Sequence, residues 1–174
     1  IARGLGRCYG DSALSKSVIS MLRLNRILDF NEDSGIVTCE SGISLEELLN
    51  VYVPKGWFLP VVPGTKFVTL GGAVASDIHG KNHHLEGSIS NHVISLLLML
   101  SDGSQIECSY DKNSDLFWAT CGGMGLTGFI LQVRLKLKKI ETAYIKQETF
   151  RCSNLDEVMQ AFEDSQNFTY SVAW

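Results

Sequence analysis

Hydrophobic and polar residues alternate most regularly near the middle of the second half of the chain. From Phe129 onward the apolar side chains would face one way and the polar ones the other, the period of two that a half-buried strand shows. The apolar positions are Phe129, Leu131, Val133, Leu135 and Leu137, and the polar ones are Gln132, Arg134, Lys136 and Lys138. The pattern predicts a long strand with one face on the core.

Shorter apolar runs predict the other strands. Residues 17–24 and 36–39 are separated by a polar turn, and residues 93–100 lead through Ser101-Asp102-Gly103-Ser104 into 105–108. The last pair has the turn residues of a hairpin. Residues 57–62 are apolar and extended.

Helix signals stand between these strands. Ser44 and Glu47 form a capping-box pattern, and the helix that it begins should run to about Val53, before Pro54 and Gly56. Two further short helices are expected at 68–75, which is small and apolar, and at 115–120, after Asn113 or Ser114.

The pattern changes after Lys139. A strand at 143–150, a helix from Ser153 or Asn154, and a strand at 168–174 would open a second α+β unit. The helix carries Leu155, Val158, Met159 and Phe162 on one face. We therefore expect one α+β domain over residues 1–139, lacking its N-terminal strands, and the truncated start of a second domain over 140–174. Ile1-Ala2 reads as the end of a strand, so the chain is expected to be a piece of a longer protein.

Composition and charge exclude some classes of function. The 174 residues are 45% hydrophobic and 20% charged, with a net charge of −4, which argues against nucleic acid as a partner. The longest apolar run, residues 96–100, is too short to span a bilayer. Five widely spaced cysteines without a C-x-x-C pair suggest reduced thiols in a cytoplasmic protein.

Two glycine-rich segments are the candidate binding elements. Residues 63–84 contain Gly64, Gly71, Gly72 and Gly80 with Thr and Ser between them, and end in His, Lys and Asn. Such a segment can bring main-chain N–H groups against a diphosphate and keep titratable groups beside a reactive centre. The alternative is an ordinary loop and a small-residue helix packed on a sheet.

The other glycine-rich segment, residues 3–12, comes earlier in the chain. Arg3 and Arg7 flank a nest of N–H groups, an arrangement that suits a diphosphate. The alternative is a surface turn, which glycine and Asp also favour.

Three other motifs are rejected. Gly123, Gly125 and Gly128 match G-x-G-x-x-G, but a helix is predicted before them and a strand after them, the reverse of a dinucleotide fingerprint. Gly80-Lys81 lacks the first glycine and the Ser or Thr of a Walker loop. His79 and His83 have metal-ligand spacing, but Gly80 weakens a helix there and no H-E-x-x-H pattern follows, so no metal is expected.

Several sequence motifs resemble those of one family, and they occur in the same order along the chain. They are Arg3–Asp11, Pro63-Gly64-Thr65, Val68–Ala73, Asp77–His84, Leu116–Thr120 and Gly125–Gly128. Together they resemble the vanillyl-alcohol-oxidase type of FAD-binding domain, also called PCMH-type. The resemblance implies an α+β fold of two subdomains with FAD between them, and a separate substrate domain.

The resemblance also implies the cofactor contacts. These residues are Arg3, Gly4, Leu5, Gly6, Arg7, Cys8, Tyr9, Gly10, Asp11, Ser12, Gly64, Thr69, Leu70, Gly71, Gly72, Ser76, Asp77, Ile78, His79, Gly80, Lys81, Asn82, His83, Gly125 and Ile130. Many members tether the flavin covalently through a His in the first loop. Arg7 stands in that place here and no His precedes His79, so noncovalent FAD is expected. Cys8 replaces a usual Ser, a change that should be tolerated.

The implied activity is oxidation of a sugar secondary alcohol by hydride transfer to flavin N5. His79 is a candidate for the proton transfer, Lys81 for holding a substrate phosphate or a developing alkoxide, and Tyr9 for walling the pocket. A purely FAD-positioning role of His79 stays open. The fragment alone is expected to be inactive.

The resemblance implies partners as well. The substrate would be a sugar or a polyprenyl-phosphosugar, with a reductase partner completing an epimerisation, in the cytoplasm or peripherally at the inner membrane. An aldonolactone or alditol oxidase domain and a non-catalytic nucleotide-binding module are the alternatives. His79 and Lys81 beside both glycine segments favour an enzyme, because a binding module needs only the glycines.

Overall fold

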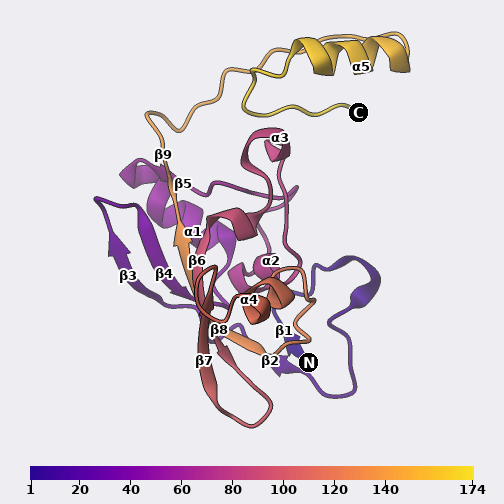
Figure 1. Ribbon diagram of the computed structural model, residues 1–174. Coiled ribbons are helices and arrows are strands. Elements are labelled where there is room, and N and C mark those ends of the chain that lie inside the picture. Colours follow the sequence, from indigo (N-terminus) through magenta and orange to yellow (C-terminus); the bar gives the residue numbers. More distant parts are fainter.

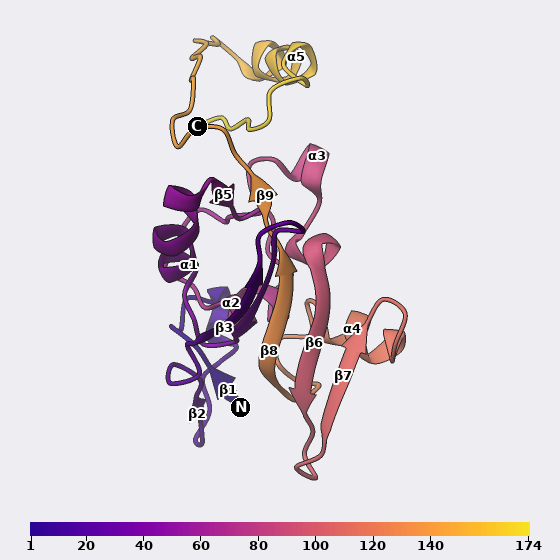
Figure 2. The same ribbon diagram turned by 90° about the vertical axis from the view of Figure 1, so that its left-hand side faces the viewer.

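A central antiparallel sheet organises the computed structural model, which describes residues 1–174 (Figure 1). Its strand order is β3-β4-β8-β6-β7. The strands are β3 (Ile27–Asn31), β4 (Ile36–Glu40), β6 (Val93–Met99), β7 (Gln105–Ser109) and β8 (Phe129–Lys136). Viewed from the side, α1 lies on the β3 side of the sheet and α4 on the β7 side (Figure 2).

The central strand β8 departs from the predicted alternation at its start. Leu97 pairs with Gln132 but Leu98 pairs with Ile130, which leaves Leu131 as a bulge. The bulge reverses the faces, so Ile130 is buried at 5% exposure, whereas Phe129 and Leu131 are only half-buried. The prediction holds from Val133 onward and is wrong for the first two apolar positions.

The N-terminal region differs from the prediction at two places: residues 17–24 contain a shorter strand than expected, and residues 27–31 form a strand that was not expected. Of the predicted strand over 17–24, only β2 (Ile19–Ser20) forms, and it pairs in parallel with β1 (Ala2–Arg3). The segment expected to be a polar turn contains β3, which pairs with β4 despite its mixed sequence. Residues 27–31 therefore form a strand because they pair with the edge of β4, although their own sequence favours a turn.

The helices largely follow the sequence signals. They are α1 (Leu45–Tyr52), α2 (Leu70–Ala75), α3 (His83–Glu86), α4 (Ser114–Thr120) and α5 (Leu155–Asp164), with short 3₁₀ turns η1 (Tyr9–Asp11), η2 (Val53–Lys55) and η3 (Ile89–His92). In α1, Leu45, Leu48 and Tyr52 are buried in a cluster of 21 apolar residues that also receives α2 and the sheet. This core fixes the start of α2, which forms part of the candidate site.

Both arms of the predicted capping box are present at the start of α1. Ser44 Oγ accepts from Glu47 N at 3.1 Å, and Glu47 Oε2 accepts from Ser44 N at 2.8 Å. We expect Ser44→Ala to lower the free energy of unfolding by about 1 kcal/mol, because the cap acceptor is lost. Urea unfolding of the full-length protein measures this, with Ser34→Ala in the turn between β3 and β4 as the control. An unchanged midpoint for Ser44→Ala would contradict the role of the cap.

A buried carboxylate closes the end of β4. Glu40 Oε2 accepts from Arg26 N at 2.8 Å and Oε1 accepts from Arg26 Nη2 at 2.7 Å. The hydrogen bonds from the Arg26 side chain, opposed in part by desolvation, lower the pKa of Glu40. The folded protein therefore holds the charged form more strongly than the unfolded chain does.

This lowered pKa gives a pH dependence of stability. The stabilisation from Glu40 is present above the ordinary pKa of a glutamate and is lost as pH falls through its lower folded pKa. The wild type should be more stable than Glu40→Gln at neutral pH, and the difference should shrink in acid. Urea midpoints of both proteins across that range test it, and a pH-independent difference would contradict the assignment.

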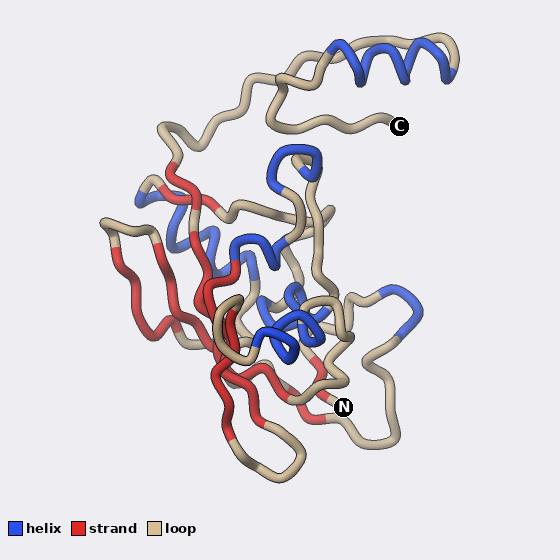
Figure 3. The backbone as a smooth tube through the Cα atoms, in the orientation of Figure 1, coloured by secondary structure: helices blue, strands red, loops and turns tan.

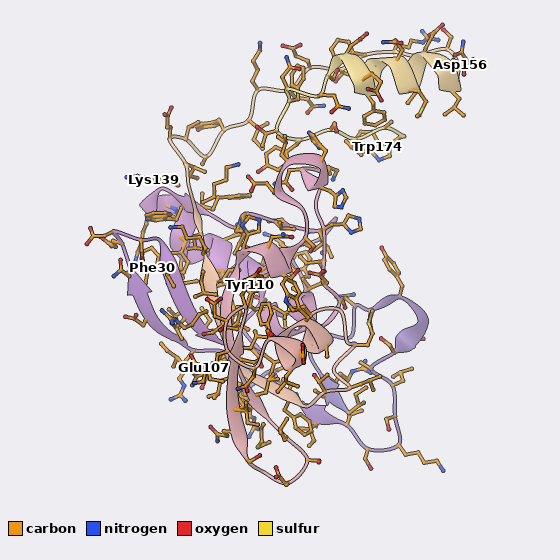
Figure 4. All side chains as sticks on the ribbon, in the orientation of Figure 1. Phe30, Glu107, Tyr110, Lys139, Asp156 and Trp174 are labelled. Carbon is orange, nitrogen blue, oxygen red and sulfur yellow. The ribbon has the colours of Figure 1, made fainter.

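The C-terminal residues extend away from the sheet. β9 (Lys138–Lys139) pairs with β5 (Trp57–Phe58), and after it residues 140–154 contain no strand (Figure 3). The helix predicted from Asn154 is confirmed as α5, whose N-cap is Asn154, but its apolar face is open, with Leu155 exposed at 72%. Asp156 and Trp174 lie on this outlying segment, far from Phe30 and Glu107 on the sheet (Figure 4).

Both strands predicted in this segment, 143–150 and 168–174, are wrong. A strand needs a partner for its backbone N–H and C=O groups, and neither segment pairs with another. Residues 168–171 instead return to the segment after α2. Ser171 N donates to Lys81 O at 3.0 Å, and His84 Nε2 lies 3.1 Å from Phe168 O. No helix of the structure is both long and apolar enough to cross a membrane.

Candidate functional site

The first glycine-rich segment is a loop with unused donors. The backbone amides of residues 4–8 donate no hydrogen bond within the structure. Gly6 has φ +64°, and a Cβ there would stand 2.5 Å from Arg3 Nη2, so the glycine lets the guanidinium fold over the loop. Free amides beside a guanidinium are groups that suit an anion.

Gly4 brings this loop against α2. A Cβ at Gly4 would lie 2.3 Å from Thr69 Oγ1, closer than any real contact allows. The two glycine-rich segments, more than fifty positions apart in the printed sequence, are therefore neighbours in space. They form one surface rather than two separate sites.

The first turn of α2 offers fewer donors than the sequence suggests. Leu70 N donates to Ile43 O and Gly71 N to Ser41 O, both at 2.7 Å, while Gly72 N donates to Thr69 Oγ1 at 3.2 Å. These amides are used inside the fold. The first loop therefore has free main-chain donors that the first turn of α2 lacks.

Gly71 and Gly72 face opposite ways. A Cβ at Gly71 would meet Ser41 Cβ at 2.7 Å, whereas at Gly72 it would meet only Thr69 Oγ1, at 2.9 Å. Gly72 is exposed and Gly71 is buried. Gly64 is exposed as well, with nothing within 4 Å of an added Cβ. Gly72 and Gly64 thus leave open surface that a ligand can approach closely.

The residues after α2 return beside it. Ile78 N donates to Ala73 O at 3.1 Å, and His79 pairs with Ser88 in a single antiparallel bridge. The side chains of Ser76, His79, Lys81 and His83 are exposed, and the rings of His79 and His83 are 5.5 Å apart, edge to face. The structure therefore places His79 and Lys81 on the surface just beyond α2.

The buried side chain of Asn82 fixes residues 80–82 to the rest of the fold. Asn82 is 1% exposed and its Nδ2 donates to Pro60 O at 2.8 Å, which ties residues 80–82 to the chain before Gly64. Asn82 Oδ1 and Ser41 Oγ are buried without a partner. A Cβ at Gly80 would come 2.7 Å from that same Oδ1, so Gly80 must be small. Asn82 therefore supports the loop from within the fold.

The third glycine cluster closes the other end of α2. Gly122 N donates to Val74 O and Met124 N to Ala75 O, at 3.1 and 2.8 Å. Helix α4 precedes this cluster and β8 follows it, so the rejection of a dinucleotide fingerprint is confirmed. A recess of about 430 Å³ lies beside it, lined by Ile1, Ala2, Leu100, Ser101 and residues 125–129.

Three predicted site residues do not join this surface through their side chains. Tyr9 is fully exposed on η1 and makes no hydrogen bond or ring contact with His79 or Lys81. The Ile130 side chain lies in the core. Both carboxylate oxygens of Asp77 are bonded to Ser88 and Ser90. Sequence reasoning missed these two serines and Ser41, since no local pattern marks them.

The first loop also contains a polarised thiol. Cys8 is half-buried, and a hydrogen bond with the Ser12 side chain, followed by smaller contributions of either sign, lowers the pKa of its thiol. By contrast, burial raises the pKa of Cys121 to about 12. The replacement of the usual Ser by Cys8 therefore keeps a hydrogen-bonding group in the loop.

The residues fit a diphosphate-containing cofactor, since free amides, a guanidinium and open glycine surface meet at one place. Residues 1–109 match the family described as "FAD binding domain". The chain belongs to this family, and the predicted likeness to the vanillyl-alcohol-oxidase, or PCMH, type is confirmed.

Among individual proteins, the chain is similar to decaprenylphosphoryl-beta-D-ribose oxidase of Mycolicibacterium smegmatis. The two are 45% identical over 179 residues, which cover 100% of this chain and 39% of that protein. L-gulonolactone oxidase of Mus musculus is 32% identical over 152 residues, 84% of this chain and 34% of that protein. The chain thus spans about two fifths or less of the length of these relatives.

A solved structure has the same fold. The carbohydrate oxidase of Microdochium nivale, in complex with a substrate analogue, superposes with a TM-score of 0.71 at 24% identity. The match covers 78% of this chain and 30% of that one. The predicted α+β FAD-binding fold is therefore confirmed.

Proposed function

We propose that this chain is the cofactor-binding part of a FAD-dependent oxidoreductase that oxidises a secondary alcohol of a sugar. The observation that carries the proposal is the contact of the first loop, which has free amides at residues 4–8, with Thr69 at the start of α2, while His79 and Lys81 are exposed just beyond the end of α2. Flavin, when bound, supplies a hydride acceptor at N5. The relatives named above support a sugar-like substrate.

The roles of the residues follow from what each can reach. The amides of the first loop and the Arg3 guanidinium would hold the diphosphate, and the recess beside residues 125–129 would receive one end of the cofactor. The open faces of Gly64 and Gly72 let the cofactor approach the backbone. Ile130 would contribute main chain only, since its side chain is in the core.

His79 and Lys81 would serve the substrate side. His79 would take the proton of the alcohol while its carbon loses hydride, or hydrogen-bond the cofactor in place. The Lys81 ammonium would hold a substrate phosphate or a developing alkoxide. Both side chains are exposed in this chain, as a role toward a substrate requires.

The finer features of the whole protein belong to the same proposal. FAD would be noncovalent, because Arg7 stands in the loop position where a tethering His is expected. Residues 1–139 would form the cofactor domain and 140–174 the start of the substrate domain. The substrate would be a polyprenyl-phosphosugar, with a reductase partner, in the cytoplasm or at the inner membrane.

A second candidate is an aldonolactone oxidase domain, favoured by the 32% identity with L-gulonolactone oxidase. The two differ in whether the substrate carries phosphate. A non-catalytic nucleotide-binding module would need the first loop but no exposed His79 and Lys81.

A visible spectrum of the full-length protein tests the proposal, before and after acid precipitation and then with candidate substrates added anaerobically. We expect yellow colour that acid releases, and bleaching by a phosphosugar. Bleaching only by an aldonolactone would select the second candidate. A colourless protein that takes up no FAD would overturn both in favour of the binding module, and colour retained in the pellet would show a covalent flavin.

A further inference from the structure

Asp77 occupies the point where α2 ends and the segment of His79 begins. Its φ is +40°, in the left-handed region that residues other than glycine seldom adopt. Both oxygens of its carboxylate are bonded: Oδ2 accepts from Ser88 Oγ at 2.9 Å, and Oδ1 accepts from Ser90 N at 3.1 Å. An unfavourable backbone conformation is thus accompanied by two bonds to a later part of the chain.

These bonds stabilise the pairing that contains His79. Ile89 N donates to Ile78 O at 2.9 Å, and His79 and Ser88 form the neighbouring bridge. Ile89 is buried, so this returning segment is anchored in the core. By binding residues on both sides of Ile89, the Asp77 carboxylate fixes residues 78–79 to that anchor.

The surroundings of Asp77 leave its carboxylate little freedom to do anything else. No Lys, Arg or His forms an ion pair with it. Ser88 Oγ lies 3.0 Å from Ser90 Oγ, which closes a small network of neutral hydroxyls and an amide. On its other side, a Cβ at Gly122 would be 3.4 Å from Asp77 Cβ. Both carboxylate oxygens are therefore used within the fold, on a residue that is half-buried.

We propose that Asp77 is a positioning residue, whose carboxylate holds residues 88–90 against 78–79 and so sets the place of His79 and Lys81 at the flavin site. Its part in the reaction rests on the proposed function. The likeness to the FAD-binding family led us to expect cofactor contact instead, and the two roles give different results on mutation.

The first test needs no cofactor. In the full-length protein, Asp77→Gly keeps a residue that adopts this φ readily and removes only the carboxylate, whereas Ser88→Ala removes one of the two bonds. We expect hydrogen exchange of the Ile89 amide to become about tenfold faster in both, with β8 unchanged. Ser34→Ala is the control, because Ser34 lies in the turn between β3 and β4 and makes no bond to residues 77–90, so this variant should exchange like the wild type at Ile89. Unchanged protection in Asp77→Gly would overturn the proposal.

The second test measures the rate of flavin reduction by substrate per bound flavin. We expect both variants to keep flavin and to be about tenfold slower at saturating substrate, with little change in KM, and the double variant to be no slower than either. General loosening of the fold would lower the amount of bound flavin instead of this rate. Flavin loss in Asp77→Gly with normal flavin in Ser88→Ala would show direct cofactor contact and overturn the proposal.

The two tests separate the inference from the function on which it rests. A wild-type protein that binds no flavin would contradict the proposed function, while the exchange experiment would still decide what the Asp77 carboxylate holds. An active wild type with unaffected variants would contradict the positioning role alone.

Discussion

Gly72→Val is expected to leave the full-length protein folded but almost free of flavin. An added Cβ at Gly72 meets only the Thr69 hydroxyl, at 2.9 Å, and otherwise points to open surface next to the first loop. A valine there would occupy space that we assign to the cofactor. Overlap of this kind costs about 1–3 kcal/mol, which weakens binding about ten- to a hundredfold. The ratio of flavin to protein absorbance after purification measures it.

The adjacent glycine provides the matched control. Gly71→Val puts a side chain 2.7 Å from Ser41 Cβ and 3.1 Å from Ser41 O, inside the core. This variant should lose about 1–3 kcal/mol of unfolding free energy with or without added FAD. Gly72→Val should keep nearly wild-type stability without FAD, apart from about 1 kcal/mol for a disturbed cap. Normal flavin content in Gly72→Val would mean that the cofactor does not pass over α2.

His79→Gln is expected to keep its flavin and to reduce it about a hundredfold or more slowly, because the amide can hydrogen-bond but cannot accept the substrate proton. The rate of anaerobic bleaching per bound flavin measures this, and the accompanying loss of pH dependence in that rate would mark a lost base. His84→Gln is the control, since the His84 ring is paired with the Phe168 carbonyl.

The competing role of His79 gives the opposite pattern. If His79 only positions FAD, His79→Gln should bind flavin less tightly while the bound fraction is bleached at the wild-type rate.

Lys81→Met tests the role of the lysine. This variant should have a higher KM for a phosphosugar and an unchanged KM for a neutral sugar, because only the phosphosugar needs the ammonium group of Lys81.

Local signals predicted the elements that are determined by neighbouring residues. The capping box of Ser44 and Glu47, the short α2, and the hairpin of β6 and β7 each depend on a few adjacent positions, and all three form as expected. The bulge at Leu131 could not be predicted, because it depends on how β8 registers with β6. The unpaired segments 143–150 and 168–174 show the same limit, since an extended sequence becomes a strand only beside another.

For the candidate site as well, the sequence predicted what depends on local residues and missed what depends on distant partners. The sequence assigned Gly4, Gly72 and His79 to two glycine-rich segments, and the contact of Gly4 with Thr69 shows that those segments meet. It could not show that the amides of Leu70 and Gly71 are already bonded within the fold, or that Asp77 is bonded to Ser88. These facts depend on partners elsewhere in the chain and leave no mark in local spacing.

The position of β8 in the sheet has a consequence for how the protein folds. Ile36 in β4 pairs with Lys136, and Val93 in β6 pairs with Leu135, so β8 joins two halves of the sheet that do not pair with each other. A ribosome must therefore release residues up to about 136 before the sheet can close. Until then β4 and β6 each expose an unpaired edge, and such long-range pairing makes folding slow. Nascent chains arrested before β8 should depend on chaperones far more than chains arrested after it.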